Sequence, residues 1–320
     1  MQSTIPRIMR IVTQDTFGGP EVFRIAEVPV PDPAPGEVLV AVTARGVNPV
    51  DAAVRAGYYP LLGEPPFTVG WDIAGRVAAL GEGVTDLEVG ERVFGLAAFP
   101  RAARGYADIV AAPREELART PAKLDDVHAA ALPLVGLTAH QAIIGTNTAA
   151  DTGLSGRRVL VQAAGGGVGH IAVQLAKAVG AHVVATASRR KLDFVAGLGA
   201  DEVVDYTARD WTAIDPVDLA VDAFGGANLL RTIGVVRDGG TVATLLGETD
   251  DAARAAATER SVTISRINVR PDPGVLDHLV RLVDEGRLVP HVSATFPLEQ
   301  VAAAHRELEG GVRGKVVLVS

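Results

Sequence analysis

The strongest constraint on the fold is a regular alternation of short apolar runs and helical segments after residue 157. The runs are rich in Val, Ala and Leu, which is typical of strands buried on both faces of a sheet. They are residues 158–161, 182–186, 202–205, 219–222 and 241–245. Helical segments between consecutive strands indicate a parallel arrangement. We therefore predict an α/β chain with a doubly wound parallel sheet in this region.

The first third of the chain has a different character. Its apolar runs, at residues 38–42, 72–77 and 92–95, are separated by Gly and Pro at the spacing of a compact, turn-rich β fold. This region is predicted to form a second, separate domain.

The end of the chain does not continue the alternation. Two helical stretches are followed by a last strand at residues 315–318, so we assign this tail to the first domain. The helical stretches are residues 276–288 and 298–308. A chain of 320 residues has room for about two domains. The predicted domains are residues 1–135 with 271–320, and residues 136–270.

Composition excludes several functions. Lys and Arg number 30 against 38 Asp and Glu, and this net charge of −8 disfavours a nucleic-acid partner. The chain has no cysteine, which excludes disulfides, thiol nucleophiles, iron–sulfur clusters and zinc sites with Cys ligands. Residues 1–7 lack an apolar signal core, and no run approaches the roughly 18 apolar residues of a membrane span. We expect a cytoplasmic protein without a membrane partner.

A glycine-rich turn, Gln-Ala-Ala-Gly-Gly-Gly-Val-Gly at residues 162–169, follows the strand 158–161 and opens a helix predicted from His170 to Val179. A strand, a glycine-rich turn and a helix in this order are the context of a dinucleotide site, with the pyrophosphate at the helix N-terminus. Ala163 stands where the first glycine of the usual pattern sits. We predict a Rossmann domain whose turn binds the cofactor through Ala164, Gly165, Gly166, Gly167 and Val168.

The second strand indicates which cofactor binds. An acidic residue about 20 residues beyond the turn would bind the ribose 2′-hydroxyl of NAD. The chain reads Ser188-Arg189-Arg190-Lys191 there and offers no acid. Arg and Ser donors suit a phosphate, and three cations at a helix start oppose the helix dipole unless an anion is present. A solvated run of charges is the alternative; we predict NADPH, contacted by Ser188, Arg189 and Lys191.

With these features in place, the chain resembles the medium-chain dehydrogenase/reductase superfamily, and in particular its zinc-free quinone oxidoreductase branch. The resemblance spans nearly the whole chain. Its landmarks are Gly46-Val47-Asn48-Pro49-Val50-Asp51, Val69-Gly70-Trp71-Asp72-Ile73-Ala74-Gly75, Val89-Gly90-Glu91-Arg92-Val93, Gly105-Tyr106-Ala107, residues 132–139, the turn with Ala163, Gly166 and Gly169, and Gly314-Lys315-Val316-Val317-Leu318. It implies a GroES-like β domain joined to the nucleotide domain, an active cleft between them, and a homodimer joined near residues 262–265.

The resemblance also implies roles for individual residues, each with a structural alternative. Asn48 would contact the nicotinamide or the substrate, or else form a turn before Pro49. Asp51 is better explained as a helix cap. The remaining cofactor contacts that the resemblance implies are Thr138, Tyr206 and Lys315. Phe224, Leu246 and Gly247 follow the fourth and fifth strands, at the carboxyl edge where doubly wound sheets bind their ligands, and are predicted to contact the cofactor on that ground.

Zinc-dependent relatives carry a Cys where this chain has Asn48, Gly-His-Glu where it has Gly70-Trp71-Asp72, and another Cys near Leu134. We therefore predict no metal and a hydride acceptor that delocalises charge itself, a quinone or an activated C=C bond. Tyr59 matches a tyrosine considered to donate a proton in related enoyl reductases. His140 is a second, less favoured donor. The alternatives are a biosynthetic enoyl or enone reductase and a non-catalytic, crystallin-like NADPH-binding protein.

Overall fold

Residues 5–146 and 153–320 are described by a computed structural model, in which the chain divides into two units. Unit 1 is Met1–Leu137 with Arg270–Ser320, and unit 2 is Thr138–Val269. The sequence expectation for the first seven residues falls partly on residues 1–4, which lie outside the described residues. Among the helices that are described, none has the length and hydropathy of a membrane-spanning segment.

Unit 2 contains the predicted parallel sheet. Its six strands run in the order β10-β9-β8-β11-β12-β13, and every neighbouring pair is parallel. The strands are β8 (Arg158–Val161), β9 (His182–Ala187), β10 (Glu202–Asp205), β11 (Val217–Asp222), β12 (Val236–Thr244) and β13 (Thr263–Arg266). The five apolar runs of the sequence are thus confirmed as strands β8 to β12.

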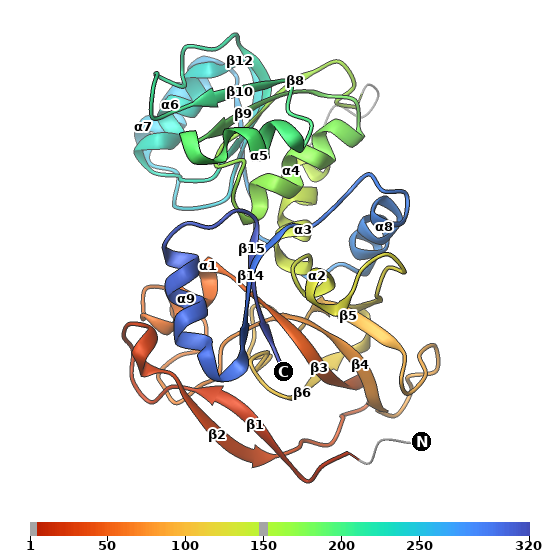
Figure 1. The fold of residues 1–320 in the computed structure, drawn as a ribbon. Helices are drawn as coiled ribbons and strands as arrows, with labels where there is room; N and C mark the ends of the chain where they lie inside the picture. Colours follow the sequence, from red (N-terminus) through yellow and green to blue (C-terminus); the bar gives the residue numbers. More distant parts are fainter. Residues whose placement is uncertain (1–4, 147–152) are drawn as a thin grey trace. The chain divides into compact units, whose positions relative to one another are not determined.

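Helices cover both faces of this sheet (Figure 1). Alternate strand residues such as Leu160, Val184 and Val242 form one buried cluster with Leu229 and Ala253. This cluster therefore places α6 and α7 on one face, and α4 and α5 lie on the other (Figure 1). The helices are α4 (Gly167–Ala178), α5 (Leu192–Gly197), α6 (Ala227–Val235) and α7 (Asp251–Glu259).

Unit 1 is built on a seven-stranded sheet with the order β14-β15-β3-β4-β5-β7, in which β6 pairs with β3. A separate hairpin of β1 and β2 completes its β structure (Figure 1). The strands are β1 (Ile8–Thr13), β2 (Arg24–Pro29), β3 (Glu37–Val47), β4 (Asp72–Leu80), β5 (Arg92–Leu96), β6 (Ile109–Pro113), β7 (Leu117–Arg119), β14 (Val292–Pro297) and β15 (Lys315–Val319). The runs 38–42, 72–77, 92–95 and 315–318 are confirmed as β3, β4, β5 and β15.

The helices of unit 1 differ slightly from the sequence expectations. They are α1 (Pro49–Arg55), α2 (Asp126–Ala130), α8 (Pro273–Asp284) and α9 (Val301–Glu309), and α3 (Pro133–His140) begins in unit 1 and ends in unit 2. Helix α8 begins three residues before and ends four residues before the helix expected over residues 276–288. It begins after an Asp272 cap with Pro273 in its first turn, and it ends where Gly286 takes a φ of +75°.

Strand register positions the functional residues of unit 1. Strand β15 pairs antiparallel with β3, with Val316 opposite Val47, and β3 pairs with β4, with Gly46 opposite Asp72. The start of β15, the end of β3 and the start of β4 therefore meet at one edge of the sheet. Helix α1 begins directly after β3, with Asn48 as its N-cap and Pro49 in its first turn. Lys315, Asn48 and Asp72 are brought together in this way.

Candidate active site

The glycine-rich turn packs α4 tightly against β8. A Cβ atom added at Gly169 would overlap the carbonyl oxygen of Ala163 and lie 2.7 Å from Ala164 Cα. Only glycine therefore lets the helix approach this closely. Helix α4 begins at Gly167, three residues before the predicted start at His170. The first N–H groups of an α-helix have no acceptor within the helix, so this turn presents donors suited to an anion.

Ala163 departs from the usual glycine pattern without losing the turn. Its φ is +48°, in the left-handed region, and its carbonyl oxygen accepts the Gly166 N–H at 2.8 Å. The position thus demands the conformation that glycine adopts most easily, and alanine adopts it here at a cost in strain.

The basic cluster lies against this turn. Ser188 directly follows β9 and is the N-cap residue of a single helical turn over Arg189–Lys191. The Lys191 Nζ atom donates to the carbonyl oxygen of Gly165 at 3.4 Å. The Arg189 side chain is exposed, and Lys191 is half-buried. The structure therefore brings together the glycine-rich turn and the cation cluster that the sequence singled out separately.

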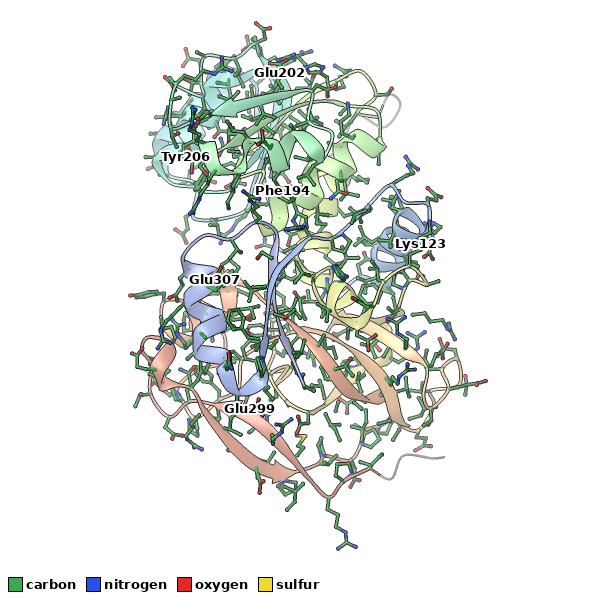
Figure 2. The ribbon with its side chains drawn as sticks, in the orientation of Figure 1. Lys123, Phe194, Glu202, Tyr206, Glu299 and Glu307 are labelled. Carbon is green, nitrogen blue, oxygen red and sulfur yellow. The ribbon has the colours of Figure 1, made fainter. Side chains whose placement is uncertain are left out.

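One further predicted residue, Tyr206, lies at the same end of the sheet. Tyr206 follows β10, and its backbone N–H donates to Ala187 O at 3.3 Å, which sets it beside Ser188. Its side chain is 48% exposed and is labelled in Figure 2. An exposed aromatic ring beside a basic cluster is available to pack on a ligand.

The loops after β11 and β12 are organised by a buried carboxylate that the sequence analysis missed. Asp222 accepts hydrogen bonds from Gly225 N at 3.0 Å, Asn228 Nδ2 at 2.6 Å and Thr244 Oγ1 at 3.1 Å. Asn228 also donates to Gln162 Oε1 at 2.7 Å, which connects these loops to the glycine-rich turn. The sequence did contain a signal for this carboxylate, because Asp222 is an acidic residue at the end of the largely apolar strand β11.

Phe224, Leu246 and Gly247 lie on these two loops, and both apolar side chains are exposed. Gly225 has a φ of +64°, and a Cβ atom there would overlap the carbonyl oxygen of Leu246. The two loops therefore contact each other closely at the carboxyl edge of the sheet, where doubly wound sheets bind their ligands.

A second set of predicted residues forms a buried cluster in unit 1. Asp72 Oδ2 accepts from Asn48 Nδ2 at 2.8 Å and from Lys315 Nζ at 3.3 Å. Lys315 Nζ also donates to Val47 O at 3.0 Å and to Asn48 Oδ1. The other carboxylate oxygen, Asp72 Oδ1, accepts the Leu134 N–H at 2.7 Å. Burial raises the pKa of Asp72, and the Lys315 ammonium opposes this increase.

Asp51 forms the next layer of the cluster. Its Oδ2 atom accepts the Asn48 backbone N–H at 2.8 Å and the Tyr106 hydroxyl at 2.8 Å. The expected capping role is therefore observed, with Asp51 at the third helical position and Asn48 as the cap itself. Burial raises the pKa of Asp51 to about 7.

The structure places the other predicted residues at separate positions. Tyr59 follows α1 and is 48% exposed, and its backbone N–H donates to Ala53 O at 3.2 Å. Thr138 lies buried in α3. The turn, the basic cluster and the β11 and β12 loops belong to unit 2, whereas Asn48, Tyr59 and Lys315 belong to unit 1.

Comparison with known proteins agrees with this architecture. Residues 34–122 match the model of the alcohol dehydrogenase GroES-like domain, and residues 198–318 match that of the zinc-binding dehydrogenases. The Lama guanicoe quinone oxidoreductase is 32% identical, over 99% of this chain and 99% of its own. The Arabidopsis thaliana chloroplastic NADPH-dependent alkenal/one oxidoreductase is 32% identical, over 99% of this chain and 81% of its own. The Coxiella burnetii quinone oxidoreductase structure superposes with a TM-score of 0.90 and 32% identity, covering 98% of this chain and 99% of its own.

A Rossmann-type unit and a GroES-like unit, each with its own cluster of polar residues, define a nicotinamide-dependent oxidoreductase. The chain belongs to the medium-chain dehydrogenase/reductase superfamily, in its quinone oxidoreductase branch.

The raised pKa of Asp51 predicts how Asp51→Asn changes stability. The unfolded chain releases the Asp51 proton near its ordinary pKa of 3.8, whereas the folded chain holds it to about 7. The folded state thus binds the extra proton between these values, so the free energy of unfolding falls as pH rises through this window. The Asn amide keeps an acceptor for Asn48 and Tyr106 and does not titrate.

The free energy of unfolding of Asp51→Asn minus that of the wild type should therefore increase from about pH 4 to about pH 7, by a few kcal/mol, and then level off. Urea unfolding followed by Trp71 fluorescence, in a Trp211→Phe background, measures this for unit 1. A difference that is constant across the window contradicts the prediction.

Proposed function

We propose that this enzyme transfers hydride from NADPH to a quinone or to an activated C=C bond of an α,β-unsaturated carbonyl, without a metal ion. The observation that carries the cofactor assignment is the contact of Lys191 Nζ with Gly165 O, which sets the basic cluster against the dinucleotide turn. The end of the second strand is where a dinucleotide site recognises the ribose 2′ position. Ser188, Arg189 and Lys191 supply donors there, and a 2′-phosphate accepts them.

The turn also suits the pyrophosphate of this cofactor. Gly165, Gly166, Gly167 and Val168 surround the N-terminus of α4, and a Cβ atom at Gly166 would meet only Ala163 O, at 3.2 Å. A ligand can therefore approach the backbone at this point. The NADPH dependence stated for the Arabidopsis relative supports the same choice.

The acceptor class rests on the chemistry of the site and on the relatives. Their descriptions name quinones and alkenals or alkenones, both of which are conjugated and electron-poor. When bound, the reduced nicotinamide supplies the hydride. The protein must then stabilise negative charge on the acceptor and deliver a proton.

Two groups of unit 1 suit these tasks. Asn48 Nδ2 donates one hydrogen to Asp72 at 2.8 Å, and its contact with Gly46 O is 3.5 Å, at the limit of a hydrogen bond. Asn48 is buried, and its second N–H, held only by this long contact, is the group that would donate to a ligand oxygen. Lys315 fixes the amide orientation through Asn48 Oδ1. Tyr59 has the exposure and the hydroxyl that a proton donor requires.

The side chains around Asp72 do not form a zinc-binding site, although the family model that matches residues 198–318 takes its name from zinc binding. Zinc requires several Cys, His or carboxylate ligands, usually four in a tetrahedron. The side-chain acceptors here are one carboxylate and one amide oxygen, and both already accept from the Lys315 ammonium. Within the described residues, no three His, Asp or Glu side chains are grouped to hold a metal.

The cytoplasmic location and the homodimer stay predictions.

The first prediction of this proposal concerns cofactor preference. NADPH should bind at least about 10-fold more tightly than NADH in a fluorescence titration, because the charge-assisted contacts to the 2′-phosphate are lost with NADH. Arg189→Gln should weaken NADPH binding and leave NADH unchanged. Arg254→Gln, on the exposed face of α7, is the matched control and should alter neither. Equal affinity of the wild type for both cofactors contradicts the assignment.

Metal independence is tested by elemental analysis of the purified enzyme, which should contain no stoichiometric zinc. Turnover should also survive prolonged treatment with EDTA, because the cation facing Asp72 is Lys315. Loss of activity on chelation, with recovery on adding zinc, is the contrary result.

Tyr59→Phe tests the proton donor. Removal of the hydroxyl should lower kcat on an enone by about 10²- to 10⁴-fold, the usual contribution of a general acid. NADPH affinity should stay the same, and quinone reduction should suffer less because a hydroquinone oxygen can take its proton from water. Tyr58→Phe removes a hydroxyl from a ring that is 87% exposed and serves as the control. Enone turnover of Tyr59→Phe within about threefold of the wild type rejects this assignment.

A further inference from the structure

A row of buried polar side chains connects Asp51 to α9 and is not used by the chemistry described above. Tyr106 OH lies 3.2 Å from His305 Nε2, and Arg55 Nη1 lies 3.0 Å from His305 Nδ1. Arg55 also donates to Glu309 Oε1 at 2.8 Å and to Gly18 O at 3.0 Å. Arg55 is 4% exposed, and Asp51, Tyr106 and His305 are completely buried.

The direction of these hydrogen bonds follows from their chemistry. An arginine guanidinium only donates, so His305 Nδ1 must accept from Arg55. Burial and the neighbouring Arg55 charge lower the pKa of His305 to about 3, so the ring is neutral and its one proton is on Nε2. Nε2 then donates to the Tyr106 oxygen, and the Tyr106 hydrogen is directed to Asp51 Oδ2.

The packing holds the His305 ring in this orientation. The His305 ring lies edge-on to Phe23, with centroids 4.8 Å apart, and edge-on to Tyr106 at 5.9 Å. Burial raises the pKa of Tyr106 well above its ordinary value, so its hydroxyl keeps its proton and remains a donor. Every bond from Arg55 to Asp51 therefore runs in one direction.

We propose that Arg55, His305 and Tyr106 are positioning residues that form a one-directional chain of donors ending on the Asp51 carboxylate, and that this chain holds Asn48 in place for hydride transfer. The role in hydride transfer rests on the function proposed above. Asp51 Oδ2 receives the chain and also accepts the Asn48 N–H, so a change at Arg55 reaches Asn48 through three side chains.

The chain acts by keeping Asp51 able to ionise while buried. The groups that face Asp51 are the Asn48 N–H, the Tyr106 hydroxyl, the Lys315 ammonium and the Asp72 carboxylate. The first three favour the ionised form, and burial and Asp72 oppose it. Loss of the Tyr106 donor should therefore raise the pKa of Asp51 further. A protonated Asp51 is a weaker acceptor for the Asn48 N–H.

The test compares His305→Gln with His305→Phe. Glutamine offers an oxygen to accept from Arg55 and an N–H to donate to Tyr106, so it preserves the direction of the chain, whereas phenylalanine keeps the ring and removes both groups. Tyr106→Phe removes the last donor, and Tyr58→Phe is the matched control for loss of an exposed hydroxyl. Trp71 fluorescence verifies that each variant is folded; if His305→Phe does not fold, His305→Gln and Tyr106→Phe decide the question.

Two readouts separate positioning from mere stability. Infrared spectroscopy follows the carbonyl band of a protonated carboxyl that Asp51→Asn abolishes, and it needs no turnover. The acid limb of the kcat profile follows the same group during reaction. The midpoint pH of the infrared titration and that of the acid limb of kcat should both increase by about one unit or more in Tyr106→Phe and His305→Phe. They should stay in place in His305→Gln and Tyr58→Phe.

The proposal is overturned if His305→Gln titrates like His305→Phe, or if folded Tyr106→Phe titrates like the wild type. It is also overturned if the infrared midpoint moves while the acid limb of kcat does not. Infrared midpoints that move as expected, in an enzyme that reduces neither quinones nor enones, support the donor chain and count against the function proposed above.

Discussion

A lysine ammonium buried against a carboxylate holds together three parts of unit 1 that are distant in the sequence. Lys315 starts β15, Asp72 starts β4, and Asn48 lies between β3 and α1, and the Lys315 and Asp72 side chains are almost entirely inaccessible. Removing either charge would leave the other buried without a counterion, which is far more costly than losing an exposed ion pair. The geometry of the Asn48 amide depends on this pair, because Lys315 faces its oxygen and Asp72 faces its nitrogen.

Unit 2 carries the proposed cofactor site, in which neutral backbone groups would bind an anion. The turn between β8 and α4 depends on glycine where α4 touches the strand, and the cation of Lys191 lies on its carbonyl side. The buried Asp222 stabilises the two neighbouring loops through side-chain and backbone donors. Side chains therefore shape the loops, and the proposed cofactor would contact the backbone donors and a few exposed cations.

The sequence predicted well those features that are local. The strands of unit 2 were recognisable because each is a short apolar run, and the turn because its glycines adjoin a strand and a helix. The donor chain was not recognisable, since Arg55 and His305 are 250 positions apart and each looks ordinary in its own helix. The small strands β1, β2, β6, β7 and β14 were missed for a related reason. Several are half-exposed or very short, so sheet pairing and not apolar content defines them.

The position of β15 has a consequence for the synthesis of the chain. This strand inserts between β14 and β3, although more than 260 residues separate β15 from the end of β3. All of unit 2, residues 138–269, leaves the ribosome before residues 315–319 exist. The Rossmann sheet can thus form co-translationally, while residues 44–47 at the end of β3 keep an open edge and Asp72 has no lysine opposite it. A nascent chain halted before β15 would carry one finished unit and one exposed sheet edge, which is the species that chaperones must protect.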